Sequence, residues 1–323
     1  MFLRIISLGL PAFLLLTGVF SAGCGPKEGS SGEQKPEHYP LGLNLVKEIS
    51  GTVLGRNLSQ PVGLASDNGG AVYVVDAGNS RLLKFDRDFQ PMREAGGFGA
   101  AEGLLSGPGY LTLDNNLNLY LPESGNRRIS IFDTKLNYVG RIELSDPDDP
   151  LKFGHPAGLA VASYGEIWVA DLDNSRLAVF NSVGNFDRFI GGVESSTGYL
   201  LTPGGMTRDA RGNVFVCDAG NGLVKKFDRF GVYDTEFGGD LLKKPSGIDI
   251  DRFGHLWVVD AGVPGIFCFE ERGGLVWSSQ DIAAVGSIEL KQPRDLTVVS
   301  DSLLVVSDTG RDRLVIYKIL YPD

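Results

Sequence analysis

Three observations predict that this chain is an all-β protein built from six similar units. One stretch of sequence recurs six times along the 323 residues, at a spacing of 42 to 48 residues. Each copy contains runs of branched and aromatic residues separated by turn residues, which is the pattern of paired strands. The 44 glycines are spread along the chain, as many short strands joined by tight turns require. Copies that follow one another without a gap indicate a repeat architecture in which each unit depends on its neighbours.

The six copies align on a proline that opens the first strand of each unit. These prolines are Pro61, Pro108, Pro156, Pro203, Pro245 and Pro293. An acidic residue stands fifteen positions after each proline, at Asp76, Glu123, Asp171, Asp218, Asp260 and Asp308. An aromatic residue stands twenty-four positions after each proline, at Phe85, Phe132, Phe180, Phe227, Phe269 and Tyr317. Columns that keep this register indicate that the six units have one common structure.

Each unit predicts a sheet of three strands followed by a weaker fourth. The second strand, for example Val72–Val75, is apolar on both faces, so both faces must be covered. Sheets stacked face to face around an axis provide that cover, and a single unit alone does not. A fourth stretch, such as Tyr138–Glu143, follows the third strand. The sequence therefore predicts a six-bladed β-propeller.

The two ends of the repeat region complement each other. The sixth unit ends at Asp323, soon after its third strand, and so has no fourth strand of its own. An unassigned strand sequence, Leu43–Gly51, precedes the first unit and is similar to the fourth strand of the second. We therefore expect residues 43–323 to form one propeller, closed by the N-terminal strand, which would also cover an exposed sheet edge.

The repeat resembles that of the NHL family. The shared features are Pro-x-Gly-Leu/Ile-Ala, an aromatic residue before Val-x-Asp, then Gly-Asn-x-Arg and Phe-Asp. The resemblance extends over nearly the whole chain after residue 43 and implies a six-bladed propeller that binds other molecules. Three copies depart from the pattern: the second has Pro122-Glu123, the fourth has Leu223 in place of arginine, and the fifth has Val263-Pro264-Gly265 without arginine.

The Asp-x-Gly-Asn-x-Arg segment between the second and third strands is interpreted as a structural turn. Glycine or asparagine there would supply the positive φ of a tight turn. The aspartate can accept hydrogen bonds from the backbone of the turn, and the arginine can pair with that carboxylate or with a neighbouring blade. The residues assigned to this structural role are Asp76, Arg81, Asp171, Arg176, Asp218, Asp260, Asp308 and Arg313.

The N-terminus has the features of a bacterial lipoprotein. Residues 1–23 contain Arg4, a short apolar run and small residues, as in an export signal rather than a spanning helix. Cys24 follows and would carry the lipid, and stable anchoring needs more than one acyl chain. Residues 24–42 are rich in Gly, Ser, Pro and charge and predict a flexible tether. We expect the protein to be anchored in the cell envelope, periplasmic or at the surface, where Cys217 and Cys268 form a disulfide or remain buried thiols.

Ligand recognition is expected where the six-fold pattern breaks. The inter-blade loops, which lead into the prolines, differ in sequence, at residues 96–107, 143–155, 190–201 and 281–292. Four positions after the prolines, where a column could face the central channel, only Asp249 carries charge. The candidate ligand-face residues are Tyr110, His155, Asp249, Arg294 and Asp295.

Charge and motif content favour a binding protein over an enzyme. The formal net charge of −10 and the export signal disfavour nucleic acid as a partner. Only three histidines occur, too few at the channel for the zinc site of propeller lyases of the peptide-amidating type, and calcium ligands are sparse. We expect no metal, no cofactor and a protein, peptide or glycan partner. The alternatives are a propeller hydrolase or lyase with a divalent-metal site in the channel, and a structural subunit of an envelope complex, possibly a redox complex.

Overall fold

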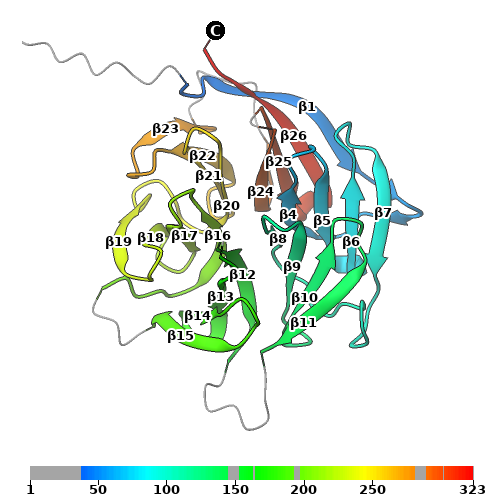
Figure 1. The fold of residues 1–323 in the computed structure, drawn as a ribbon. Helices are drawn as coiled ribbons and strands as arrows, with labels where there is room; N and C mark the ends of the chain where they lie inside the picture. Colours follow the sequence, from blue (N-terminus) through cyan, green and yellow to red (C-terminus); the bar gives the residue numbers. More distant parts are fainter. Residues whose placement is uncertain are drawn as a thin grey trace, which may run out of the picture. The chain divides into compact units, whose positions relative to one another are not determined.

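The computed structural model describes residues 38–144, 153–162, 164–192, 197–280, 289–300 and 302–322. The predicted signal sequence, Cys24 and most of the predicted tether lie outside these residues. Residues 37–323 form one compact unit of antiparallel sheets (Figure 1). Among the described residues, none belongs to a helix with the length and apolar character needed to cross a membrane.

Six four-stranded sheets form the blades, with the first strands around the centre of the ring (Figure 1). Blade 1 comprises β4 (Pro61–Ser66), β5 (Val72–Asp76), β6 (Arg81–Phe85) and β7 (Pro91–Gly96). Blade 2 comprises β8 (Thr112–Leu113), β9 (Asn118–Glu123), β10 (Arg128–Asp133) and β11 (Tyr138–Glu143). Blade 3 comprises β12 (Pro156–Val161), β13 (Ile167–Asp171), β14 (Arg176–Phe180) and β15 (Phe186–Gly191). Blade 4 comprises β16 (Pro203–Arg208), β17 (Val214–Asp218), β18 (Leu223–Phe227) and β19 (Tyr233–Phe237). Blade 5 comprises β20 (Pro245–Ile250), β21 (Leu256–Asp260), β22 (Gly265–Phe269) and β23 (Leu275–Ser278). Blade 6 comprises β24 (Pro293–Val299), β25 (Leu303–Asp308), β26 (Arg313–Leu320) and β1 (Gly42–Ser50).

The core lies between the blades rather than inside any one of them. Within the described residues, six apolar clusters each join two neighbouring blades, including the pair formed by blade 6 and blade 1. The second strands, apolar on both faces in the sequence, are buried along their whole length in blades 1, 3, 4 and 5. The prediction of a six-bladed all-β propeller is therefore confirmed.

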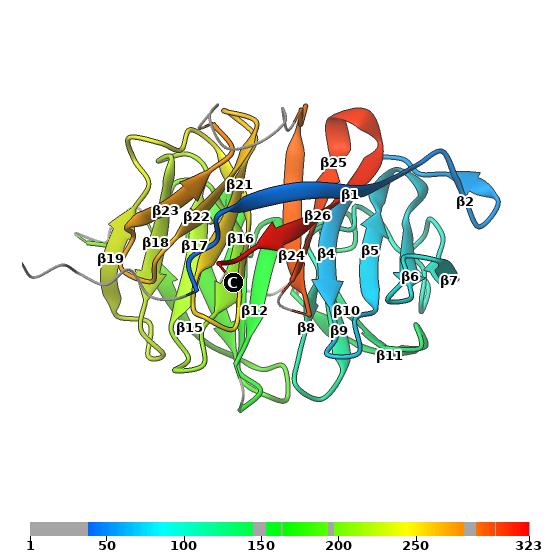
Figure 2. The ribbon, with the colours of Figure 1, turned by 90° about the horizontal axis from the view of Figure 1, so that it is seen from above.

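The N-terminal strand β1 is the outer strand of blade 6. It runs antiparallel to β26, from the pair Gly42 and Leu320 to the pair Ser50 and Arg313 (Figure 2). Leu43 is fully buried in the cluster between blades 5 and 6. The strand begins one residue earlier than the expected Leu43. A short hairpin of β2 (Thr52–Val53) and β3 (Arg56–Asn57), which the sequence did not indicate, leads from β1 into blade 1.

The last residues of the predicted flexible tether pack against the propeller. His38 stacks on Phe253 with 4.6 Å between ring centroids, and Tyr39 lies against His255. Pro40 is buried. His38 and Tyr39, inside the predicted tether, therefore contact blade 5 before β1 begins.

Cys217 and Cys268 are free, buried thiols. They lie in two different clusters, one between blades 4 and 5 and the other between blades 5 and 6. Burial raises the pKa of both thiols well above the ordinary value. Of the two alternatives left open by the sequence, the structure has the buried thiols.

The acidic residue before each second turn binds the inter-blade loop rather than the turn alone. The Asp76 carboxylate accepts a hydrogen bond from the Ser59 amide at 2.7 Å, and the five corresponding acids accept from amides 16 or 17 residues upstream. All six acids are fully buried. Each acid therefore ties the start of its own blade to the end of the second strand.

A basic side chain completes this arrangement in five of the six blades. Arg81, Arg128, Arg176 and Arg313 pair with the acid of their own blade at 2.7 to 3.0 Å. In blade 4, where Leu223 replaces arginine, the buried Lys225 lies 3.8 Å from the Asp218 carboxylate. Lys225 stands two residues further along β18 and so lies on the same face of the strand. In blade 5, four backbone amides donate to Asp260 at 2.7 to 2.9 Å.

The glycine of this turn is required for a reason other than the one expected. Positive φ falls on the residue after the asparagine, such as Ser80 with φ of 50° and Ser175 with φ of 53°. A Cβ on Gly78 would lie 2.4 Å from the Ser59 hydroxyl oxygen and 2.9 Å from the Ser59 carbonyl oxygen. The prediction that glycine supplies positive φ is therefore wrong at this position. Glycine stands there because the inter-blade loop passes too close for a side chain.

Candidate functional site

The first strands narrow the channel at the second position after the prolines. Four of the six residues in this layer are glycines whose neighbours leave no space for a Cβ. A Cβ on Gly158 would lie 1.9 Å from the Gly204 carbonyl oxygen, and one on Gly247 would lie 2.5 Å from the Asp295 Cα. We call this layer the constriction. It consists of Gly63, Tyr110, Gly158, Gly205, Gly247 and Asp295.

Tyr110 and Asp295 are the two side chains that occupy the constriction. Tyr110 comes from blade 2, and its hydroxyl donates a hydrogen bond to the Ser246 carbonyl oxygen of blade 5, across the channel, at 2.9 Å. The Arg294 guanidinium lies 5.1 Å from the centroid of the Tyr110 ring. Burial raises the pKa of the Tyr110 phenol to about 12, so the phenol remains a neutral donor. Tyr110 is 6% exposed, and we infer that it closes the channel at this level.

A cavity of about 580 Å³ lies on one side of the constriction. Its wall is the layer four positions after the prolines, where five residues are small and neutral and Asp249 is acidic. This layer consists of Ala65, Thr112, Ala160, Thr207, Asp249 and Thr297, all of which line the cavity. The column that the sequence placed in the channel therefore does face it. A cavity of this size can hold a small molecule or a short peptide.

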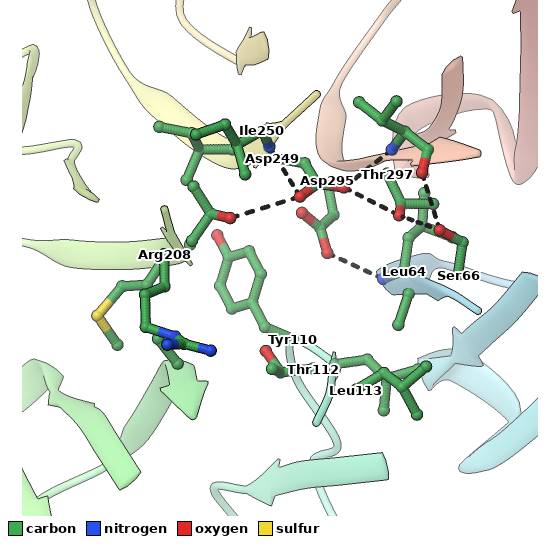
Figure 3. Close-up of a pocket in the computed structure, with 18 of the residues that line it drawn as sticks. Leu64, Ser66, Tyr110, Thr112, Leu113, Arg208, Asp249, Ile250, Asp295 and Thr297 are labelled. Carbon is green, nitrogen blue, oxygen red and sulfur yellow. Dashed lines mark hydrogen bonds between the residues drawn. The ribbon is translucent and has the colours of Figure 1, made fainter. Parts of the chain in front are cut away.

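Asp249 and Asp295 form an acidic pair at the closed end of the cavity (Figure 3). Asp249 accepts from the Ile250 amide at 2.8 Å and from the Val298 amide at 2.9 Å. Asp295 accepts from the Leu64 amide at 2.9 Å. Burial raises the pKa of both carboxyl groups, and the charge of Asp249 raises the pKa of Asp295 further. An ionised pair here is costly unless a positive group or a hydrogen-bond donor faces it.

Arg208 is the basic residue of the cavity wall. It is the last residue of β16, next to the turn that leads into the second strand. The Nε of Arg208 is buried and, within the described residues, has no hydrogen-bond partner. Burial lowers the pKa of the guanidinium from its usual value. A buried donor without a partner costs stability, and an anionic ligand would remove that cost.

The cavity reaches the turns between first and second strands, where Asp67, Asn68, Asn115 and Ser300 line it. Among the described residues, those of the inter-blade loops do not line it. This differs from the expectation that the candidate residues surround a mouth beside those loops. Tyr110 and Asp295 fill the channel at that end, because they replace glycine in the narrowest layer. Parts of the loops at residues 143–155, 190–201 and 281–292 lie outside the described residues.

The sequence-based candidates fall into two groups. Tyr110, Asp249 and Asp295 line one cavity, and Arg294 covers the Tyr110 ring from outside it. His155 is separate: its Nδ1 lies 2.6 Å from a carboxylate oxygen of Asp173, at an exposed turn.

Sequence reasoning missed Arg208. The signal is present in the next column, five positions after the prolines, where Arg208 is the one charged residue among Ser66, Leu113, Val161, Arg208, Ile250 and Val298.

The described residues contain no group of three or more His, Cys, Asp or Glu side chains arranged to hold a metal ion. The carboxylate of Asp249 accepts hydrogen bonds from the hydroxyls of Thr207 and Thr297. The cavity therefore provides hydrogen bonding and charge of both signs, which suits ligand binding.

Comparison with known proteins supports this description of the fold. The family model described as NHL repeat matches residues 58–85 and 153–180. "Protein brain tumor" of Drosophila melanogaster is 27% identical over 173 residues, which are 51% of this chain and 16% of that protein. "B-box type zinc finger protein ncl-1" of Caenorhabditis elegans is 24% identical over 127 residues, which are 39% of this chain and 15% of that protein. The matched regions are thus less than a fifth of each relative.

Solved structures share the fold at low sequence identity. A streptogramin B lyase has a TM-score of 0.59 and 16% identity, covering 87% of this chain and 88% of the lyase. A Bacteroides thetaiotaomicron protein of unknown function has a TM-score of 0.67 and 14% identity, covering 86% of this chain and 76% of that one. These similarities concern the fold alone. Together with the repeat motifs and the six observed blades, the matches support an NHL-repeat β-propeller of six blades.

Proposed function

We propose that this protein is a lipid-anchored binding protein of the bacterial cell envelope that holds a protein, peptide or glycan partner in the central cavity of its propeller. One observation carries the proposal: the side chains that break the six-fold repeat at the axis gather around one cavity. Asp249 is the charged exception of its column, Tyr110 and Asp295 are candidate ligand-face residues, and all three line the cavity together with Arg208. Residues that depart from the repeat and lie together in space are suited to recognise a ligand, because the repeated residues already stabilise the scaffold.

Anchoring is supported by the sequence of residues 1–42, with Cys24 as the lipidated residue. Replacing Cys24 with serine removes the thiol that would carry the lipid. We expect the Cys24→Ser protein to leave the membrane fraction and appear in the soluble envelope fraction. Persistence of this variant in washed membranes would contradict the anchor.

Binding through the cavity can be tested on protein extracted from membranes in mild detergent. Native mass spectrometry should detect a species bound to the wild-type protein and its loss from a variant with Arg208→Gln and Asp249→Asn. The matched control is Arg211→Gln, which changes another arginine of blade 4 whose side chain is 76% exposed. A bound species that survives the double substitution would place the site elsewhere, for example at the inter-blade loops.

An enzyme with a divalent metal is the main alternative. Two solved lyases share the fold, but at 14 to 16% identity they carry no argument about activity. A resident metal would raise stability by mass action. We expect Ca²⁺ or Zn²⁺ to leave the melting temperature nearly unchanged, and a rise of several degrees would favour the metalloenzyme.

A further inference from the structure

The central cavity has opposite charges at its two ends. Asp295 lies in the constriction, at the second position after its proline. Asp249 lies in the next layer, at the fourth position, and Arg208 lies at the fifth, beside the turns that form the mouth. Figure 3 shows the three charged groups, with the Tyr110 ring among them, directed into the same space from blades 4, 5, 6 and 2. A ligand that enters from the turns passes Arg208 and Asp67, whose carboxylate already accepts hydrogen bonds from Gly69, Ala71 and Tyr73, before it reaches the acidic pair.

Asp295 and Arg208 retain hydrogen-bonding capacity, whereas each oxygen of Asp249 already accepts two hydrogen bonds. Among the described residues, the two oxygens of Asp295 accept one backbone hydrogen bond each, from Leu64 and Leu296 at 2.9 and 3.0 Å. A carboxylate oxygen can accept two, so each has room for another donor. At the other end, the buried Nε of Arg208 has no partner among the described residues. A positively charged donor would complete the hydrogen bonding of Asp295, and an anion at the mouth would complete that of Arg208.

The spacing of the charged layers limits the length of the ligand. A strand rises about 3.3 Å per residue, so three positions along the first strands correspond to about 10 Å. An extended peptide spans at most about 3.5 Å per residue. Two or three residues therefore bring a terminal amine and a terminal carboxylate to the two ends of the cavity.

The wall of the cavity favours a peptide over other molecules with both charges. Each first strand is the end strand of its sheet, and these strands supply most of the lining. An end strand presents backbone N–H and C=O groups on its free edge, and an extended peptide can pair with them. The hydroxyls of Thr112, Thr207 and Thr297 donate to Leu159 and Asp249, and their oxygens can accept a hydrogen bond from a ligand.

From these observations we propose that the cavity binds a peptide of two or three residues, with its free amino group toward Asp249 and Asp295 and its carboxylate at Arg208. This inference rests on the proposed function, because it names the ligand of the same cavity.

Isothermal titration calorimetry with four probes tests the proposal on the wild-type protein. The probes are trialanine, dialanine, N-acetyl-trialanine, which lacks the amine, and trialanine amide, which lacks the carboxylate. We expect trialanine or dialanine to bind and each blocked form of trialanine to bind at least tenfold more weakly. Equal binding of blocked and unblocked trialanine would overturn the proposal, as would no binding of either unblocked peptide at millimolar concentration.

Two substitutions assign the ends of the peptide. Arg208→Gln should abolish the preference for trialanine over its amide and leave the preference for the free amine. Asp249→Asn should reduce the preference for the free amine over the acetylated form. Arg211→Gln serves as the control and should match the wild-type protein. If Asp249→Asn does not fold, Asp295→Asn takes its place, and the probe series on the wild-type protein remains decisive.

The outcomes separate this inference from the proposed function. If the peptides fail but native mass spectrometry shows a species displaced by cavity substitutions, the cavity binds another ligand and only the peptide inference is wrong. If the cavity substitutions displace nothing and the peptides fail, both the proposed binding site and the peptide inference are wrong.

Discussion

The turns between the second and third strands and the central channel contain the same residue types in different roles. At the turns, Asp76 and Arg81 are fully buried and satisfied by each other and by backbone groups. In the channel, the buried Nε of Arg208 has no partner among the described residues, and the charge of Asp249 raises the cost of ionising Asp295. A carboxylate and a guanidinium are structural where they satisfy one another and available for a ligand where they do not. Substitutions at the two places should therefore differ in their effect on stability.

Breaking a turn pair should have the largest effect. Arg81→Ala leaves the Asp76 carboxylate buried and uncompensated, and removes the bonds from Arg81 to the hairpin carbonyls of Val53 and Arg56. Loss of one partner of a buried pair costs about 3–5 kcal/mol. We expect a decrease of that size in the free energy of unfolding, measured with urea. Arg208→Ala should cost less than about 1 kcal/mol, since its guanidinium leaves no paired acid behind. Equal losses would contradict the distinction.

Weakening the outer strand of blade 6 should have the next largest effect. Leu43 is fully buried, whereas Leu45, two residues along the same strand, is 59% exposed. Leu43→Ala should destabilise the protein by about 2–4 kcal/mol through the lost apolar contacts and the cavity left behind. Leu45→Ala is the matched control and should change stability by about 0.5 kcal/mol or less. A small loss at residue 43 in thermal and urea unfolding would argue against a structural role for β1.

Removing one hydroxyl in the constriction should have a smaller effect. Tyr110→Phe keeps the ring against Arg294 and deletes the hydrogen bond to the Ser246 carbonyl oxygen. A buried hydrogen bond is worth about 1 kcal/mol. We expect a loss of that order in urea unfolding. A loss of several kcal/mol would show that the hydroxyl holds opposite blades together, as the turn pairs hold their own blades.

The smallest effect should be a change in pH dependence. The pKa of Asp249 is raised in the folded protein by burial, from an ordinary value of 3.8. Its contribution to stability is therefore complete below pH 3.8 and is lost as the pH rises through the folded pKa. Above pH 3.8, the free energy of unfolding of the wild type should fall relative to that of Asp249→Asn as the pH rises, measured by urea unfolding at several pH values. Parallel pH profiles would mean that Asp249 is not destabilised by burial.

Much of the fold could be predicted from the sequence because the repeat is local and periodic. The proline, acid and aromatic columns identified six blades, and strands apolar on both faces required neighbours on both sides. The fourth strand of blade 6 was indicated by an unpaired strand at one end and a missing strand at the other. The role of Gly78 could not be predicted, since it depends on the approach of Ser59, nineteen residues earlier in the chain. The packing of His38 on Phe253 likewise joins residues far apart in sequence.

The sequence by itself determined the all-β class, the number of blades and the exceptional residue Asp249, because each of these follows from comparing the columns of a repeat; Tyr110 and Asp295 were candidates by their position. Only the tertiary structure decided what these residues do. It brings them around one cavity, adds Arg208, and lines the cavity with turn residues and, among the described residues, with none of the inter-blade loops. The physical reason is that glycines let the first strands approach so closely that one tyrosine reaches across the channel and closes it.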